Sequence, residues 1–268
     1  MTSDHEPTAF DFVRLRRDAD VLRVTIDRPD DPLNRVNGQM HHELTGLFAE
    51  LKQERQARAV LLTGSGRAFS AGGDFGWFPE LQAPGALEDL RVDARQMISD
   101  LLDVPVPIVC AINGHAVGLG ASIALLCDVI YMAESATIAD PHVRVGLVAG
   151  DGGTIAWPLA LGPARAKQYL LTGDPVAASE AERIGLVNRV VADHELDAEA
   201  LAFAHRLAAL PPLAVRHTKA AVNHWVKESA MASFDRATAS EIETFRSADH
   251  AEALASISEG RPPRYRGR

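Results

Sequence analysis

Two glycine-rich stretches of the sequence could bring backbone amides against a ligand. The first, GRAFSAGGDF, covers residues 66–75, and the second, INGHAVGLGASIALLCD, covers residues 112–128. Glycine lacks the Cβ that would keep a ligand away from the backbone. A helix is expected to begin near Gly118–Gly120, and the first amides of a helix have no intrahelical partner and carry a positive dipole. Together with an amide from the Ala71–Gly73 turn, such a helix end could stabilise an oxyanion.

Neither stretch carries a nucleotide-binding motif. No G-x-G-x-x-G sequence lies between a strand and a helix with an acidic residue about twenty positions later, as a dinucleotide site requires. No G-K-[ST] follows either stretch, so a Walker A loop is excluded as well. Taken alone, each stretch is better explained as a tight turn in a packed fold.

The hydrophobic pattern predicts the elements that must position these stretches. Strands are expected within residues 10–29, as a pair around a turn at Asp18–Asp20, and at 58–66, 107–113, 129–134 and 187–191. Helices are expected at 38–56, 86–104, 161–173 and 179–187, and in several segments from 193 to 259. Strands and helices that alternate before a run of helices are typical of an α/β domain with a helical C-terminal region.

The composition is that of an ordinary globular protein. Hydrophobic residues make up 47% of the 268 and charged residues 24%. The net charge of −9 argues against general binding to nucleic acid or to anionic membranes, which favour a basic protein face. Cys110 and Cys127 lie in apolar stretches and are expected to be buried, reduced thiols. The start, MTSDHEPTAF, lacks a signal-peptide pattern and no apolar run could cross a membrane, so we expect a cytoplasmic protein.

Several segments in order carry a resemblance to a known family. AFSAGGD is followed by NGHAVGLGASIALLCD, by GDGGT and by LGPARAKQYLLTGDPVAASEAERIGLVNRVV. From about Phe12 to its end, the chain resembles the crotonase (enoyl-CoA hydratase/isomerase) superfamily. The resemblance implies an α/β fold: a spiral of ββα units with the active site in residues 1–195, and a helical C-terminal region in residues 196–268 for trimerisation and ligand cover. It also implies a homotrimer or a dimer of trimers.

The same resemblance implies that two backbone amides stabilise a thioester enolate. By position these amides belong to Ala71 and Leu119, and amides fixed in place need no reorganisation as charge develops. Coenzyme A would enter as part of a small acyl-CoA substrate, and no permanently bound cofactor is implied. The positions expected to contact the substrate or its CoA are Asn34, Arg35, Val36, Ser70, Gly72, Gly73, Asp74, Gly118 and Trp157.

The chain departs from the family pattern at both positions where a hydratase carries a catalytic glutamate. In GLGAS the first position is Ser122, and in ADPH the second is His142. Hydration needs a positioned acid and base to add water across a double bond. A serine cannot be that base unaided, so Ser122 is expected to line the pocket, hold a water or assist His142. Ordinary hydration of a 2-enoyl-CoA is therefore not expected.

His142 and Asp151 are the remaining candidates for acid–base chemistry. Together with GDGGTIAWPLALG, the pair resembles oxocamphor hydrolase, the family branch that cleaves carbon–carbon bonds of cyclic β-diketones. A histidine near its ordinary pKa is a good general base at pH 7, and Asp151 could orient it, hold water or carry a proton. Asp151 could equally be a helix N-cap, and His142 an ordinary hydrogen-bonded loop residue.

Other aromatic and histidine residues are interpreted as structural. Phe75, Trp77 and Trp157 are expected in the apolar pocket or the core. His41 and His42 are expected on a helix surface, where adjacent positions give poor metal geometry, so no metal site is predicted.

Three hypotheses for function stay open. The first is an acyl-CoA enzyme that forms an enolate with a histidine and an aspartate in place of two glutamates. The second is a retro-Claisen hydrolase of a β-diketone that does not use CoA. The third is a catalytically inactive scaffold, or an RNA-binding family member, although the acidic balance counts against RNA.

Overall fold

The computed structural model describes residues 10–268, and ten strands of this range form two sheets. The expectation about the first nine residues therefore lies outside the described part. The larger sheet has the order β1-β2-β3-β5-β7-β10, with an antiparallel hairpin β1/β2 and parallel pairing from β2 onward. Its strands are β1 (Val13–Asp18), β2 (Val21–Ile26), β3 (Ala59–Gly64), β5 (Ile108–Ile112), β7 (Val129–Ala133) and β10 (Arg189–Val191).

The smaller sheet has the order β4-β6-β8-β9, and its parallel strands decide where the site lies. The pairs β4/β6 and β6/β8 are parallel, whereas β8/β9 is antiparallel. Because parallel strands end at the same edge of a sheet, the residues that follow β4, β6 and β8 meet there. The strands are β4 (Ala68–Ser70), β6 (His115–Val117), β8 (Thr137–Ala139) and β9 (Val176–Ala177).

Three successive ββα units build a spiral, which confirms the predicted fold. In each unit one strand joins the larger sheet, the next joins the smaller sheet, and a helix follows: β3–β4–α2, β5–β6–α3 and β7–β8–α4. The first helices are α1 (Gly38–Leu51), α2 (Ala86–Asp103), α3 (Leu119–Leu125), α4 (Gly153–Leu161), α5 (Pro163–Thr172) and α6 (Ala178–Arg183), with 3₁₀ turns η1 (Phe78–Gln82) and η2 (His142–Val145).

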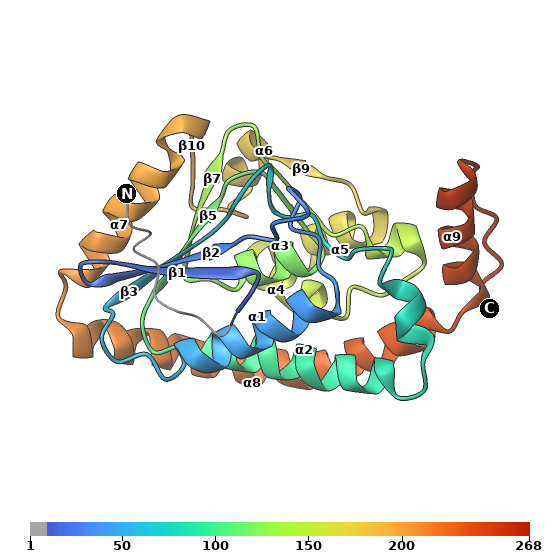
Figure 1. Ribbon diagram of the computed structural model, residues 1–268, viewed down its shortest axis with the longest axis horizontal. Coiled ribbons are helices and arrows are strands. Elements are labelled where there is room, and N and C mark those ends of the chain that lie inside the picture. Colours follow the sequence, from blue (N-terminus) through green and yellow to red (C-terminus); the bar gives the residue numbers. More distant parts are fainter. Residues whose placement is uncertain (1–9) are drawn as a thin grey trace.

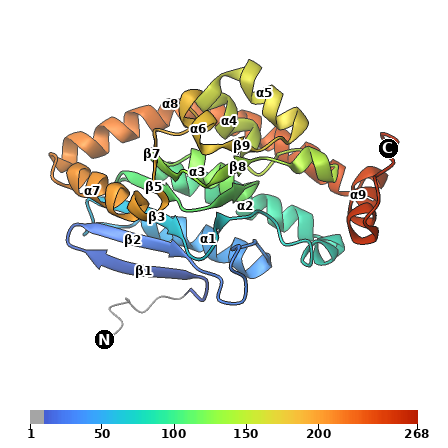
Figure 2. The same cartoon turned by 90° about the horizontal axis from the view of Figure 1, so that it is seen from above.

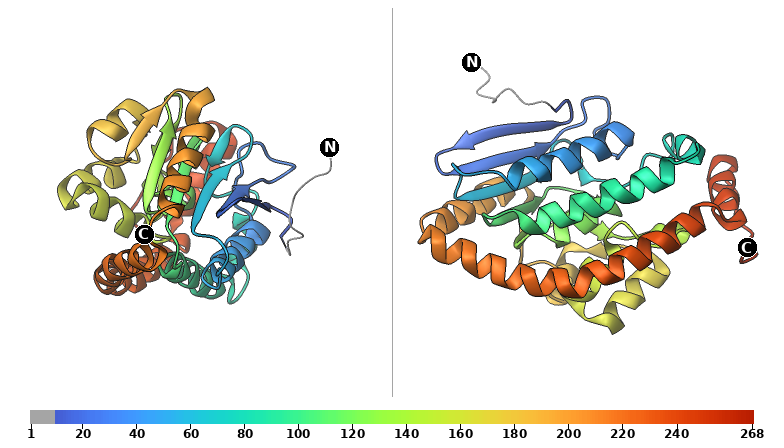
Figure 3. Two further views of the ribbon diagram at one scale, coloured as in Figure 1. Left: turned by 90° about the vertical axis from the view of Figure 1, so that its left-hand side faces the viewer. Right: turned by 90° about the horizontal axis from the view of Figure 1, so that it is seen from below.

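The C-terminal region is helical, as predicted, and it packs on the spiral. It comprises η3 (Asp193–Glu195), α7 (Leu196–Ala208), α8 (Pro212–Phe245) and α9 (Ala248–Glu259). Helix α7 lies on β3 and β5, and the long α8 runs beside α2 below the sheet (Figures 1 and 3). Seen from above, α9 and the C-terminus lie at the end of the molecule opposite α7 (Figure 2). In the described range no helix is long and apolar enough to span a membrane.

The core fills the space between the larger sheet and its helices. Strand β5 is buried over its whole length, and β3 is buried except at its last two residues, which explains why both carry unbroken apolar runs. Cys110 and Cys127 are both buried free thiols, as expected. The sequence pattern predicted the long strands and helices within a few residues, and a helix was expected directly after Asp151, where α4 lies, but the pattern missed the two- and three-residue strands of the smaller sheet.

Candidate active site

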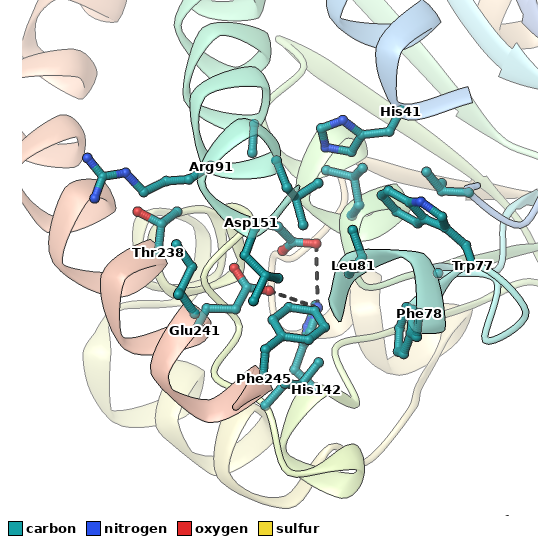
Figure 4. A pocket seen from close by; sticks show the side chains of 18 residues that line it. His41, Trp77, Phe78, Leu81, Arg91, His142, Asp151, Thr238, Glu241 and Phe245 are labelled. Carbon is teal, nitrogen blue, oxygen red and sulfur yellow. Dashed lines mark ion pairs between the residues drawn. The ribbon is translucent and has the colours of Figure 1, made fainter. Parts of the chain in front are cut away.

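A largely apolar pocket opens where the parallel strands of the smaller sheet end, and α8 closes it from one side. Helices α1 and α2, the 3₁₀ turn η1 and helix α8 supply most of its wall (Figure 4). Its apolar lining includes Trp77, Phe78, Leu81, Leu87, Leu90, Leu147, Ile242 and Phe245. Its polar side chains are His41, Arg91, His142, Asp151, Thr238 and Glu241. An apolar cleft with a few convergent polar groups is the usual form of a small-molecule site.

Within the pocket, His142 lies among three carboxylates. Its Nδ1 is 2.5 Å from Oδ1 of Asp140, and its Nε2 is 3.5 Å from Oδ2 of Asp151. The same Nε2 is 3.9 Å from Oε1 of Glu241 (Figure 4). The Ser122 hydroxyl donates to Oδ1 of Asp151 over 3.4 Å. The fold thus brings the predicted His142, Asp151 and Ser122 together and adds two acids.

The cluster shifts the pKa of its members in a direction that changes the role expected for His142. Burial alone would lower the pKa of His142, but the charges of Asp140 and Asp151 and the bond to Asp140 outweigh it and raise the pKa well above its ordinary value. The imidazole is therefore protonated at neutral pH. The expectation of a neutral histidine base is wrong, because it treated His142 as an isolated side chain.

Burial also shifts the pKa values of Asp151 and Glu241, the two acids near Nε2 of His142, to different extents. It raises the pKa of Asp151, while the positive His142, the Ser122 hydroxyl and the Gly153 amide pull that pKa back. Burial and the charge of Asp151 raise the pKa of Glu241 well above its ordinary value, and only His142 opposes them. Two acids beside the same imidazole nitrogen whose surroundings differ in this way can divide acid and base roles. Asp151 therefore ionises at a lower pH than Glu241.

Glu241 was not found from the sequence, although its helix carries a signal. Thr238, Glu241, Ile242 and Phe245 recur at helical spacing, so one acid stands on the face of α8 that lines the pocket. Gly150 makes room for it, since a Cβ at that position would lie 2.5 Å from Oε2 of Glu241. Only packing shows that this face of α8 meets His142.

Asp140 was also missed by the sequence analysis. It is buried, and its hydrogen bond to Nδ1 orients the imidazole of His142.

The N-cap of α4 is Gly152, with no side-chain cap bond, so the structure does not show Asp151 as the N-cap. Donor atoms of Asp140, His142 and Asp151 lie within 4.8 Å of one another, a spacing that could hold a metal ion. Asp140 hydrogen-bonds Nδ1 of His142, so only Nε2 faces Asp151. The absence of a metal ion from this cluster stays a prediction.

The oxyanion prediction needs a correction at one of its two amides. The N–H of Ala71 donates to the Leu33 carbonyl over 2.9 Å, and Ala71 does not line the pocket, so this amide is wrong. Gly73, two residues further along the chain, does line the pocket. Val36 donates to the Gly72 carbonyl and accepts from the Asp74 N–H, so the Gly73 N–H between them points away from Val36.

Leu119 begins α3 and lines the same pocket. Within residues 10–268, neither the Gly73 nor the Leu119 N–H has a backbone acceptor. These two amides can therefore serve as hydrogen-bond donors to a ligand in the pocket.

Most of the other predicted contacts support the site from behind. The buried Asn34 amide donates to the carbonyls of Ile26, Ser65 and Ala68, so it holds loops together and is wrong as a ligand contact. Arg35 is tied to Asp31 through its Nε at 2.7 Å. Three of the predicted contacts lie behind the pocket wall: Ser70, Gly72 and Asp74. The Ser70 hydroxyl donates to the Asn34 carbonyl, and Asp74 pairs with Arg28. Val36 does line the pocket.

The aromatic and histidine expectations have mixed outcomes. Trp157 is completely buried against Tyr169 in the core, one of the two places expected for it, but it does not line the pocket, so its expected substrate contact is wrong. Phe75 is 46% exposed, whereas Trp77 lines the pocket as predicted. His41 was expected on the surface but is buried and lines the pocket, and its neighbour His42 is exposed. Helical rotation separates the two adjacent histidines.

Fold and site together define an α/β protein of the ββα-spiral class whose pocket sets free backbone amides beside an acid–base cluster. The chain belongs to the enoyl-CoA hydratase/isomerase family, whose model matches residues 16–268. It is 32% identical to a Mycobacterium bovis protein described as a probable enoyl-CoA hydratase, covering 96% of this chain and 98% of that one. It is 30% identical to 1,2-epoxyphenylacetyl-CoA isomerase of Escherichia coli, covering 96% and 99%.

A solved structure agrees with this membership. The crystal structure of an enoyl-CoA hydratase/isomerase from Mycobacterium paratuberculosis superposes with a TM-score of 0.88 at 40% identity, covering 93% of this chain and all of that chain. Relatives with different reactions share the family, so the family alone leaves the reaction open.

Proposed function

We propose that this chain is an enolate-forming enzyme that acts on an acyl-CoA thioester. The carrying observation is one pocket in which the amides of Gly73 and Leu119 adjoin the cluster of His142, Asp151 and Glu241. Amides fixed in a largely apolar site stabilise the negative oxygen of an enolate without reorganisation. Support for the thioester comes from relatives whose names carry CoA compounds.

In the proposed reaction, the two acids at Nε2 of His142 divide proton transfer. The Asp151 carboxylate removes a proton from the carbon beside the carbonyl, and the electron pair moves onto the oxygen held by the two amides. Glu241, still protonated, returns a proton to carbon. His142 remains an imidazolium that Asp140 orients, and it balances the charge of Asp151 throughout.

The replaced positions argue against ordinary hydration. The resemblance implies that Ser122 and His142 occupy the positions at which a hydratase of this family carries its two glutamates. Ser122 is buried, and its hydroxyl donates a hydrogen bond to Asp151. We expect crotonyl-CoA hydration below about 1 s⁻¹, the low end of typical enzyme turnover; turnover well above that value contradicts the proposal.

A second candidate is retro-Claisen cleavage of a cyclic β-diketone, in line with the resemblance to oxocamphor hydrolase. Asp151 would take a proton from water, and the resulting hydroxide would bond to one carbonyl carbon. The carbon–carbon bond would break towards the enolate at the amides, and Glu241 would protonate the carbon. The observation in its favour is that Arg35, an expected CoA contact, and the nearby Arg28 are each bound to carboxylates.

An inactive or RNA-binding scaffold is the weaker reading. An oriented histidine with two acids of raised pKa in a cleft is the arrangement that functional sites show. Loss of function by drift would not be expected to retain it.

The test is deuterium exchange in heavy water. Butyryl-CoA and 1,3-cyclohexanedione are incubated separately with the wild type and with Asp151→Asn, and mass spectrometry records deuterium uptake and any ring-opened acid. Uptake into butyryl-CoA that Asp151→Asn abolishes supports the first candidate. Ring opening without uptake into the thioester supports the second, and no reaction with either probe contradicts both.

We also propose that the chain assembles as a homotrimer or a dimer of trimers. The resemblance motivates this, and α8 exposes the large apolar side chains of Leu213, Val222 and Trp225, as an interface would. Light scattering of the purified protein tests it, and a monomeric mass contradicts it.

A further inference from the structure

His41 is a buried titratable side chain that the proposed reaction does not use. It is 5% exposed, it comes from α1, and it lines the pocket. Figure 4 shows it on the α1 side of the pocket, apart from the linked group of His142, Asp151 and Glu241. The backbone N–H of His41 donates to the Asn37 carbonyl over 2.9 Å. Within residues 10–268, neither ring nitrogen of His41 has a hydrogen-bond partner.

The surroundings of His41 hold it in place and keep it uncharged. Its ring lies against that of Trp77, with centroids 6.0 Å apart. Trp77 in turn rests on Gly38, where a Cβ would lie 2.9 Å from the indole Nε1. Burial lowers the pKa of His41 to about 4; the charge of Asp93 opposes this shift and His42 adds to it. At neutral pH the imidazole therefore offers one donor and one acceptor.

The ring nitrogens of His41 are not among the fully buried, unpaired polar atoms of the described residues, so water can reach them through the pocket. An apolar ligand that displaces this water would leave the imidazole unpaired, whereas a ligand oxygen would replace the lost hydrogen bond. Among the other lining residues, Trp77, Leu81 and Leu87 provide contact area for an alkyl group but carry no hydrogen-bond acceptor for the imidazole. Arg91 and Thr238 belong to the α2 and α8 side, where Thr238 already donates to the Phe234 carbonyl.

We propose that His41 is a specificity-determining residue that hydrogen-bonds a second oxygen of the substrate, a keto or hydroxyl group beyond the reacting carbonyl. The inference rests on the proposed function and narrows its substrate class. The preferred substrate is an oxygenated acyl group or a 1,3-dicarbonyl compound, and an unsubstituted alkyl chain leaves the imidazole unpaired.

Binding of two matched probe pairs tests the inference. Calorimetry in the Asp151→Asn background, which prevents turnover, compares acetoacetyl-CoA with butyryl-CoA and 1,3-cyclohexanedione with cyclohexanone. The oxygenated member of at least one pair should bind about fivefold more tightly, the worth of one neutral hydrogen bond. His41→Leu should abolish that preference, and His41→Gln, which keeps a donor and an acceptor, should restore part of it.

A neighbouring histidine supplies the matched control. The side chain of His42 is 82% exposed on the same helix, so His42→Leu should leave the preference unchanged. Equal affinity within both pairs, no binding of any probe, or a preference that survives His41→Leu overturns the inference. Deuterium exchange by His41→Leu with Asp151 intact separates the two proposals: if exchange persists while the preference was never present, only the role of His41 has failed.

Discussion

Asp140 and His142 form the shortest link in the acid–base cluster: Oδ1 of Asp140 lies 2.5 Å from Nδ1 of His142, which leaves Nε2 to face Asp151 and Glu241. The two residues are neighbours across Pro141 at the end of β8, so the strand end itself fixes the pair. The bond orients the ring, and the charge of Asp140 helps to keep the imidazole protonated.

Asp140→Asn should lower the exchange rate by about 10- to 100-fold, because an orienting partner is lost while the shape is kept. Because the charge of Asp140 raises the pKa of His142, its removal should also move the titration of that ring to lower pH. Imidazole nitrogen NMR follows the titration. Asp100→Asn is the control, since Asp100 is equally buried but pairs with Lys52 away from the pocket. An unchanged titration would show that Asp140 has no electrostatic role.

Glu241→Gln should stabilise the protein, and more so as the pH rises. Glu241 has a raised pKa, so above its unfolded value near 4.5 the folded chain retains a proton that the unfolded chain releases. The wild-type protein therefore loses stability as the pH rises. The amide side chain of the variant does not ionise, so Glu241→Gln should be more stable than wild type by roughly 1–3 kcal/mol at pH 8. Urea unfolding at pH 5 and pH 8 measures it.

The exposed neighbour Glu243 supplies the control for this experiment. Glu243→Gln should change stability little at either pH. A gain for Glu241→Gln that is equal at both pH values would contradict the raised pKa of Glu241.

Gly118→Ala should disturb the cluster through the backbone. Gly118 has φ +54°, where other residues are strained, and a Cβ there would lie 3.3 Å from Cε1 of His142. We expect a loss of about 1–3 kcal/mol in stability and a fall of about 100-fold in exchange rate. Gly185→Ala carries similar strain at φ +77° with nothing within 4 Å, so it should lose stability alone. Equal exchange rates for the two variants would refute the role given to Gly118.

His41→Leu should weaken the acid sensitivity of the fold. The pKa of His41 is about 4 in the folded protein against 6.5 for an exposed histidine, so below about pH 6.5 the unfolded chain gains a proton that the folded chain refuses. Wild type should lose about 3 kcal/mol relative to His41→Leu between pH 7 and pH 4. Thermal or urea unfolding across this range measures the difference, with His42→Leu as control. Parallel stability curves for wild type and His41→Leu would contradict the buried, neutral state.

The sequence was a good guide to local features. Apolar runs and helical spacing located the long strands and helices, because these patterns follow directly from burial of one face. The glycines at 72, 118 and 120 and the pair His142 and Asp151 were visible for the same reason: backbone freedom and titratable groups are properties of single positions. The family and its spiral fold followed from the order of these motifs.

Which of these residues act together was decided only by the tertiary structure. Asp140 directly follows β8, whereas Glu241 and His41 come from α8 and α1, and no sequence spacing joins the three. Their pKa values depend on burial and on charges brought near by packing, so a histidine expected to be neutral is charged and one expected on the surface is buried and neutral. The sequence by itself determined the elements and the candidate chemistry; the meeting of the strand ends under α8 decided which amides are free and which acid holds the proton, because hydrogen-bond partners and electrostatic fields exist only between segments in contact.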